Sequence, residues 1–101
     1  MNRTLQIDLE TIDRLRELSR DGEIEAIARI IELLSTGAKI DLAALVILGT
    51  GVAESYTTAY AIAFAARSTG FNHLSSVPFD NVLPKALGRL PVGVFVPGYS
   101  F

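Results

Sequence analysis

The amino-acid sequence predicts a small single domain of the α/β or α+β class over residues 1–101, with a helical N-terminal third packed on a short sheet. Half of its 101 residues are hydrophobic, which suits one domain with one core. Residues 23–35 carry apolar side chains at helical spacing, whereas residues 42–48 and 92–96 are apolar runs of strand length. Residues 42–48 could also begin a helix, so an all-α fold with a C-terminal extended segment is the alternative.

The N-terminal third, residues 1–36, is predicted to be a strand followed by two helices. Polar and apolar residues alternate over Thr4–Leu9, as they do in a half-buried strand. Asp8 or Thr11 can cap the helix that follows, and Asp21–Gly22 is a suitable end for it. The apolar face of this helix consists of Ile12, Leu15 and Leu18.

The second helix is expected over residues 23–35, with Gly37 as the residue that ends it. Residues 1–36 hold five arginines and eight acidic residues, a charge of −3, while residues 37–101 hold four basic and three acidic residues, a charge of +1. Charges of alternating sign predict a solvated helix face. Neither part has the basic surplus that general nucleic-acid binding requires, so nucleic acid is not an expected partner.

Residues 42–70 are predicted to form a strand, a glycine turn and a helix over 52–68. Such a turn presents backbone N–H groups at the positive end of a helix dipole, where phosphate and carboxylate groups bind. The candidate ligand-binding residues are Gly49, Thr50, Gly51 and Ser55. They suggest a phosphorylated small molecule as ligand, and the alternative is that the glycines only let the chain turn.

The remaining residues, 71–101, are predicted to form a loop, a short helix over 81–90 with Pro84 in its first turn, and a terminal strand over 92–96. Prolines at both ends of this strand fit an edge position. An apolar edge strand is normally covered by a partner, which indicates a homo-oligomer or a second protein. The candidate interaction residues are Val92, Val94, Phe95, Val96, Tyr99 and Phe101.

Chemically reactive side chains are sparse. The chain has no cysteine and one histidine, so no disulfide, cysteine nucleophile, metal or cofactor is expected. Glu54, His73 and Asp80 are a candidate polar site if the fold brings them together. Taken singly, Glu54 suits the first turn of a helix, His73 a solvated loop and Asp80 a helix cap. No catalytic residue is identified, and the sequence favours a non-catalytic protein.

The location of the protein is predicted from its N-terminus, which is polar and charged and lacks the apolar stretch of a signal peptide. A cytoplasmic protein is therefore expected. Residues 42–66 are apolar enough to raise the question of a membrane span. Two glycines and Glu54 in the middle of this stretch argue against it.

Several segments follow one another in an order known from a ligand-binding family. LVILGTGVAESYTTAYAIAFAARSTGF is followed by PFDNVLPKAL and then by VGVFVPGYS. From Leu45 to Ser100, this order resembles the first half of a sugar isomerase (SIS) domain, a phosphosugar-binding α/β fold. The resemblance implies a phosphosugar site at Gly49–Ser55, although Ala53 stands where that family has its turn serine. It also implies a fragment or a reduced relative that completes its sheet by oligomerising.

Residues 3–36, RTLQIDLETIDRLRELSRDGEIEAIARIIELLST, resemble a ribbon-helix-helix module in outline, because a strand precedes two helices. The resemblance implies that Thr4, Gln6 and Asp8 face DNA bases and that the strands of two copies pair. The acidic charge of the segment opposes DNA binding.

The sequence therefore leads to three hypotheses of function. The first is a non-catalytic interaction or assembly module that self-associates or covers a partner through its apolar C-terminal strand. The second is a phosphosugar-binding or anion-binding domain of the SIS type, which uses the Gly49–Ser55 turn. The third is a ribbon-helix-helix DNA-binding dimer.

Overall fold

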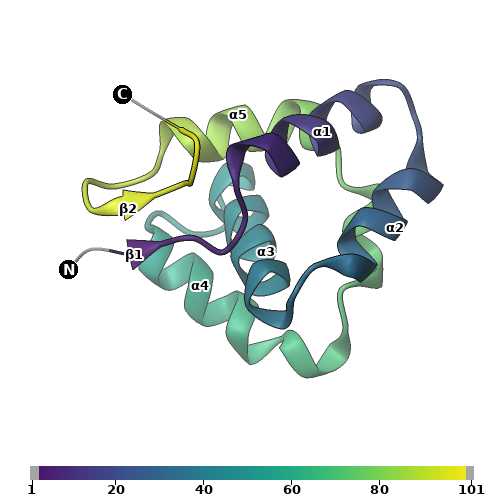
Figure 1. Ribbon diagram of the computed structural model, residues 1–101. Helices are drawn as coiled ribbons and strands as arrows, with labels where there is room; N and C mark the ends of the chain where they lie inside the picture. Colours follow the sequence, from purple (N-terminus) through teal and green to yellow (C-terminus); the bar gives the residue numbers. More distant parts are fainter. Residues whose placement is uncertain (1–2, 100–101) are drawn as a thin grey trace.

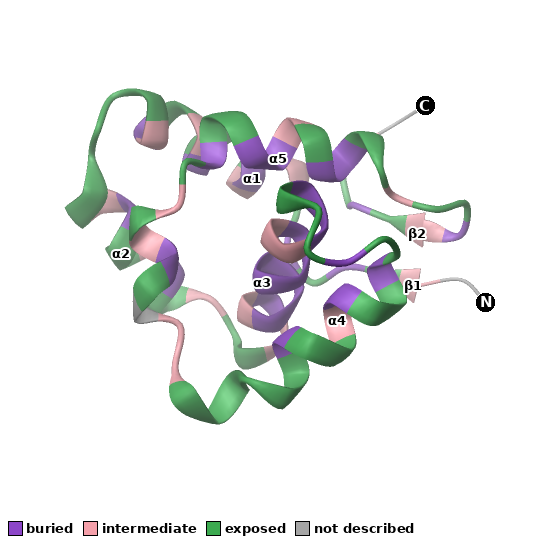
Figure 2. Ribbon diagram, turned by 180° about the vertical axis from the view of Figure 1, so that it is seen from behind, coloured by how far each residue is buried: buried purple, intermediate pink, exposed green. Residues whose placement is uncertain are grey.

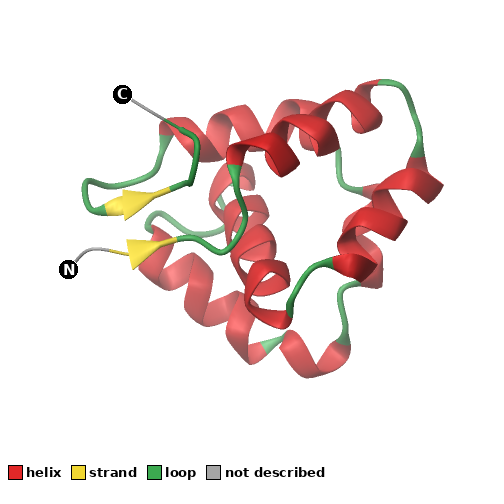
Figure 3. Cartoon of the chain, viewed as in Figure 1, coloured by secondary structure: helices red, strands yellow, loops and turns green. Residues whose placement is uncertain are grey.

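The computed structural model describes residues 3–99, apart from the side chain of Asn72. Over this range the chain forms five α-helices, two short 3-10 helices and a two-stranded parallel sheet (Figures 1 and 3). The elements are β1 (Arg3–Thr4), α1 (Leu9–Arg20), α2 (Ile24–Leu33), α3 (Thr36–Thr50), α4 (Tyr56–Ala65), η1 (Arg67–Thr69), η2 (Asn72–Ser76), α5 (Phe79–Gly88) and β2 (Val94–Phe95). The fold is a small α+β domain in which helices dominate.

The two N-terminal helices confirm the sequence prediction. Asp8 is the N-cap of α1, and its carboxylate accepts a hydrogen bond from the Thr11 backbone N–H at 2.9 Å. The predicted apolar face of α1 is buried, and the helix ends at Arg20 before Gly22, whose φ is +73°. Four residues, Ile24, Ile27, Ile31 and Leu34, are expected on the apolar face of the second helix; Ile27 and Ile31 are buried, Leu34 is half-buried and Ile24 is exposed.

Removal of the Asp8 cap is expected to lower the free energy of unfolding by about 1 kcal/mol at neutral pH. Hydrogen bonds from Thr11 lower the pKa of the Asp8 carboxyl below its usual value. The pKa of Asp8 is therefore lower in the folded state than in the unfolded state. As a result, the Asp8 carboxylate stabilises the fold above about pH 4, and this stabilisation is lost as the pH falls through the folded-state pKa. Urea unfolding of Asp8→Ala at neutral and acidic pH tests this.

The matched control for the cap is Asp13→Ala, which removes an exposed carboxylate further along α1. Its effect should stay below about 0.5 kcal/mol, because the ion pair of Asp13 with Arg16 is exposed. An Asp8→Ala effect that is independent of pH would contradict the proposed role of the carboxylate.

The strand expected over residues 42–48 is wrong, because these residues form the middle of α3. This helix begins at the N-cap Ser35, whose hydroxyl accepts from the Ala38 N–H at 3.1 Å, and ends at Gly51 with φ +82°. The helix is buried on nearly all sides, so its apolar run shows no helical period. Gly37 does not end α2 as expected but lies in the first turn of α3, against the side chain of Gln6.

The helix expected over residues 52–68 is shorter than predicted, since α4 covers only Tyr56–Ala65. The chain continues through η1 to Gly70, where the helical segment ends as expected. In the loop predicted after it, η2 forms one 3-10 segment. Helix α5 begins at Phe79, two residues before the predicted start, so Pro84 lies beyond its first turn. Phe79, the first residue of the helix, is fully buried in the core.

The sheet pairs β1 with β2 in parallel, with Arg3 opposite Val94 and Thr4 opposite Phe95. The predicted strands at Thr4–Leu9 and 92–96 are thus confirmed only in part, and residues 42–48 take no part in the sheet. The Arg3 N–H donates to the Gly93 carbonyl at 2.6 Å and the Leu5 N–H to the Phe95 carbonyl at 2.8 Å.

The core is built around α3, which lies at the centre of the molecule (Figure 1). Helices α4 and α5 pack directly on α3, while α1 packs on α5 and α2 on η2 and α1. In Figure 2, α3 is mostly buried, whereas much of α4 is exposed. In the part of the chain that the structure describes, no helix has both the length and the apolar character needed to cross a bilayer.

Candidate functional site

The predicted ligand-binding turn lies at the C-terminal end of a helix. Gly49 and Thr50 are the last residues of α3, and Gly51 is its C-cap. One guanidinium nitrogen of Arg89, Nη1, donates to the carbonyl oxygens of Leu48 at 2.9 Å and Gly49 at 3.3 Å. The expected positive dipole end is therefore absent here, because a helix presents carbonyl groups at its C-terminus, and a cation already binds them.

The fourth candidate residue, Ser55, is the N-cap of α4. Its hydroxyl oxygen accepts from the Thr58 backbone N–H at 3.2 Å, and the hydroxyl donates to the Thr58 side chain at 3.1 Å. Three residues, 52–54, separate this cap from the glycine turn. Gly49 has a packing role instead, because an added Cβ would collide with Val82 of α5.

Glu54, His73 and Asp80 lie on different segments of the chain: Glu54 precedes α4, His73 is in η2 and Asp80 is in α5. Asp80 accepts a hydrogen bond from the Ser19 hydroxyl at 3.1 Å. Within residues 3–99, no hydrogen bond or ion pair joins the three. The described residues also contain no group of three or more His, Cys, Asp or Glu side chains arranged to hold a metal ion.

A buried polar network, which the sequence does not predict, is centred on Asp41 of α3. Asp41 has no solvent-exposed surface. Its carboxylate accepts three hydrogen bonds: from Arg3 Nη2 at 3.1 Å, from the Gln6 backbone N–H at 2.8 Å and from the Tyr56 hydroxyl at 2.8 Å. A buried charge is stable only when it is paired and hydrogen-bonded, and here β1, α3 and α4 together supply those partners.

The network around Asp41 connects the N-terminal segment to the helices and offers no accessible reactive group. Tyr56 is almost fully buried, like Asp41, so neither presents a reactive atom to a ligand. Arg3 closes the network toward solvent by lying over the ring of Tyr60, 4.0 Å from its centre. The three hydrogen bonds fix the N-terminal segment against the helices.

Alkaline pH is expected to weaken the fold through Tyr56. Burial, and next the neighbouring Asp41 carboxylate, raise the pKa of the Tyr56 phenol above its usual value of about 10. The pKa of Tyr56 is thus higher in the folded state than in the unfolded state. The protonated phenol therefore stabilises the fold fully below about pH 10, and this stabilisation is lost as the pH rises through the folded-state pKa. Thermal unfolding of wild type and Tyr56→Phe over this range tests it: their stability difference should shrink above about pH 10. A constant difference would argue against it.

An exposed apolar surface lies on the side of α4 that faces away from the core. We call this surface the α4 outer face. It consists of Thr57, Thr58, Ala61, Ile62, Phe64 and Ala65. Ile62 is 41% exposed and Phe64 44% exposed, although the sequence of α4 is apolar around most of its circumference and contains no charged residue.

Arginine and aromatic side chains form a continuous stack along one edge of the α4 outer face. The rings of Tyr60 and Phe64 are stacked with their centres 6.1 Å apart. Arg3 covers Tyr60, and Arg67 lies over Phe64 with its guanidinium carbon 3.8 Å from the ring centre. Arg67 also donates to the Phe64 carbonyl at 2.6 Å, which fixes its position beside the helix.

The predicted interaction strand is only partly exposed. Val92 is fully exposed and Phe95 is 43% exposed, whereas Val96 is buried in the core. Val94 and Tyr99 are half-buried and pack against the core of their own chain. Phe101 lies outside the described residues.

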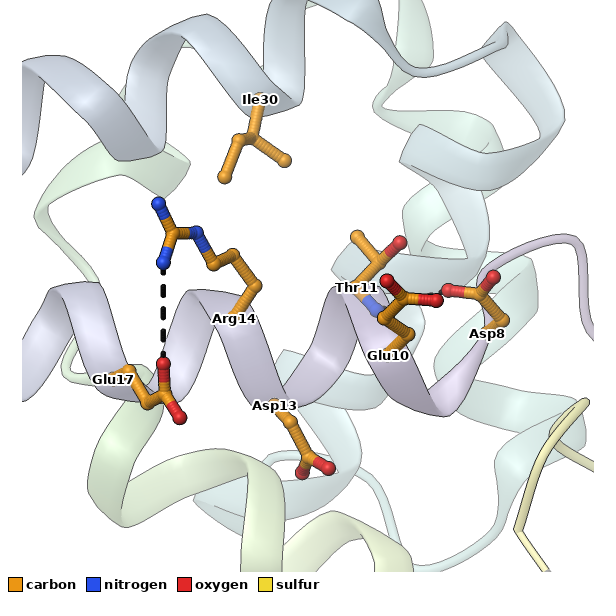
Figure 4. A pocket seen from close by; sticks show the side chains of 7 residues that line it. All are labelled: Asp8, Glu10, Thr11, Asp13, Arg14, Glu17 and Ile30. Atoms are coloured by element: carbon orange, nitrogen blue, oxygen red, sulfur yellow. Dashed lines mark hydrogen bonds and ion pairs between the residues drawn. The ribbon is translucent and has the colours of Figure 1, made fainter.

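A surface groove of about 660 Å³ runs along α1 beside Ile30 of α2 (Figure 4). Its acidic lining comprises Asp8, Glu10, Asp13 and Glu17. Two of its side chains, Arg14 and Glu17, approach to 4.0 Å, and both are well exposed. The groove therefore matches the solvated charged face that the sequence predicts, and not an enclosed binding site.

The chain matches no protein-family model, no curated protein and no solved structure. Its function is therefore inferred from its own geometry.

Proposed function

We propose that this protein is a non-catalytic assembly module that associates with a second copy of itself through the α4 outer face. The observation that supports this most directly is the mismatch between the composition of α4 and its burial. A helix that is apolar around its circumference is normally enclosed by other elements, but α4 buries only Tyr56, Ala59 and Ala63. The remaining apolar surface suits an interface.

Two further observations favour a second copy as the partner. The residues of the α4 outer face carry hydroxyl, methyl, sec-butyl and aromatic groups and no charge of their own, so the face is compatible with an identical face. Thr57, Ala61 and Ala65 are small and recur every four residues, which allows two helices to approach closely. No reactive group described above lies on this surface, which is consistent with a binding role.

The strand β2 is the second candidate surface for the same self-association. Val92 and Phe95 are exposed, and β2 pairs on one side only with β1. Because Val96 is buried and Val94 and Tyr99 pack on the chain's own core, this surface offers less apolar area than the sequence predicts. The proposal therefore favours α4 over β2.

Sedimentation equilibrium over a range of protein concentrations tests the proposal. Wild type should dimerise in the micromolar range, which corresponds to about −8 kcal/mol of association free energy. Ala61→Lys places a long charged side chain at the centre of the α4 outer face and should leave the protein monomeric. Alanine and lysine have similar helix propensities, so the fold should persist by circular dichroism.

The matched control is Ala28→Lys, which makes the same change at an exposed position of α2 and should leave association unchanged. If Phe95→Glu abolishes association and Ala61→Lys does not, the interface lies at β2. A wild-type protein that stays monomeric at several hundred micromolar contradicts self-association. Binding of phosphatidylcholine vesicles or of another protein by such a monomer would assign the exposed surface to that partner instead.

A further inference from the structure

Along the chain, the charged residues that flank α4 lie at its two ends and have opposite sign, while the guanidinium of Arg3 lies over the ring of Tyr60 at the edge of the helix. Glu54 precedes the helix and Arg67 follows it, and no charged residue lies between them. Both are exposed. Within the described residues Glu54 has no ion-pair partner, and Arg67 is fixed beside the ring of Phe64. In sequence, the outer face therefore has an acidic residue before its N-terminal end and a basic residue after its C-terminal end.

We propose that two copies associate with their α4 helices antiparallel, so that Glu54 of each copy faces Arg67 of the other. The inference rests on the self-association proposed above and specifies its geometry. In an antiparallel pair, a two-fold axis runs perpendicular to the two helices, and each contact occurs twice. Glu54 of one copy therefore faces Arg67 of the other at both ends of the pair. A parallel pair would instead place Glu54 beside Glu54 and Arg67 beside Arg67.

The spacing of the residues agrees with this arrangement. The midpoint between positions 54 and 67 falls between residues 60 and 61, which is also the midpoint of α4. The two-fold axis would thus pass close to Ala61, at the centre of the small-residue row formed with Thr57 and Ala65. Small side chains at the crossing point allow the close approach, and the larger Ile62 and Phe64 lie on either side of it.

The prior placement of Arg67 favours the contact further. Its guanidinium is held by the stacking on Phe64 and by the hydrogen bond to the Phe64 carbonyl. A side chain that is already ordered loses less conformational entropy when it forms an ion pair. Antiparallel packing also aligns the two helix dipoles favourably, because the N-terminus of one lies beside the C-terminus of the other.

Charge exchange tests the antiparallel pairing. Glu54→Arg and Arg67→Glu each convert both contacts into like-charge pairs, so each should weaken dimerisation about ten-fold at low salt. The double variant restores opposite charges at both ends and should return the dissociation constant to within about two-fold of wild type. Glu25→Arg and Arg29→Glu, at exposed positions of α2, make the same changes in net charge and should have little effect.

Disulfide cross-linking gives an independent result, because the chain contains no cysteine. Ala61→Cys should cross-link two copies efficiently, since the two cysteines would lie next to the two-fold axis. Ala65→Cys should not, because the antiparallel register separates the two equivalent positions by about 13 Å along the helix axis. In a parallel pair both variants would cross-link.

The outcomes separate the two proposals. If wild type dimerises and Ala61→Lys abolishes it, but the charge variants behave like their α2 controls and Ala65→Cys cross-links, the antiparallel register is wrong and self-association through α4 stands. If wild type does not dimerise, or if Ala61→Lys has no effect, both proposals fail.

Discussion

Replacing Asp41 by alanine is expected to lower the free energy of unfolding by about 3–5 kcal/mol. The substitution removes the acceptor for the buried Tyr56 hydroxyl and for the Gln6 N–H, whose hydrogen bond is part-buried, and it releases Arg3. Each buried donor left without a partner costs about 1–3 kcal/mol. The total is a large share of the 5–15 kcal/mol that typically stabilises a folded domain.

Urea denaturation of Asp41→Ala, wild type and Asp80→Ala measures this effect. Asp80 is exposed and contacts only the Ser19 hydroxyl among the hydrogen bonds of the described residues, so its removal should change stability by less than about 0.5 kcal/mol. If Asp41→Ala does not fold, Tyr56→Phe removes a single donor and should cost about 1–2 kcal/mol. A loss below 1 kcal/mol for Asp41→Ala would show that the network does not stabilise the fold.

Replacing Gly49 by alanine is expected to destabilise the protein by about 1–3 kcal/mol. An added Cβ would lie 2.8 Å from Val82 Cγ1 and closer still to the Val82 carbonyl oxygen. That oxygen belongs to the backbone of α5 and cannot move unless the helix shifts away from α3. The collision therefore outweighs the gain of about 1 kcal/mol that alanine normally brings to a helix interior.

Gly88→Ala is the matched control, because an added Cβ at Gly88 meets no atom within 4 Å and the residue ends α5. It should leave the thermal unfolding midpoint unchanged or raise it slightly, so the two glycine variants should change stability in opposite directions or by clearly different amounts. Equal effects of the two substitutions would show that the close approach of α3 to α5 at Gly49 is not required.

The amphipathic helices could be predicted from the sequence, and the buried one could not. In α1 and α2, one apolar face against solvent produces the helical period, and Asp8 and Gly22 mark the ends of α1. In α3 this period is absent because neighbours cover nearly all of its surface, while Val46 and Ile47 favour a strand. The caps Ser35 and Gly51 are the signals that identify the helix, but Gly37 in its first turn also fits the end of the preceding helix.

The hydrogen-bond partners of the buried Asp41 could not be predicted from a single sequence, for a different reason. An aspartate next to an apolar run indicates a charge that needs partners, since acidic residues are almost never fully buried unless paired. Nothing local identifies those partners, because Arg3 lies 38 residues before Asp41 and Tyr56 lies 15 residues after it. Likewise, the exposure of the α4 outer face depends on which elements cover the helix, and the sequence predicts only its apolar composition.

The parallel pairing of β1 with β2 has a consequence for how the chain folds. Helices α3 and α4 are neighbours in sequence and can pack after a short loop closes, whereas Arg3 meets Val94 only by closing almost the whole chain. Contacts with such long sequence separation carry the largest loop-closure entropy. The docking of β1 therefore carries a larger entropic cost than the packing of α3 on α4, and the Asp41 carboxylate gains its hydrogen bonds from Arg3 and Gln6 only when this N-terminal segment is in place.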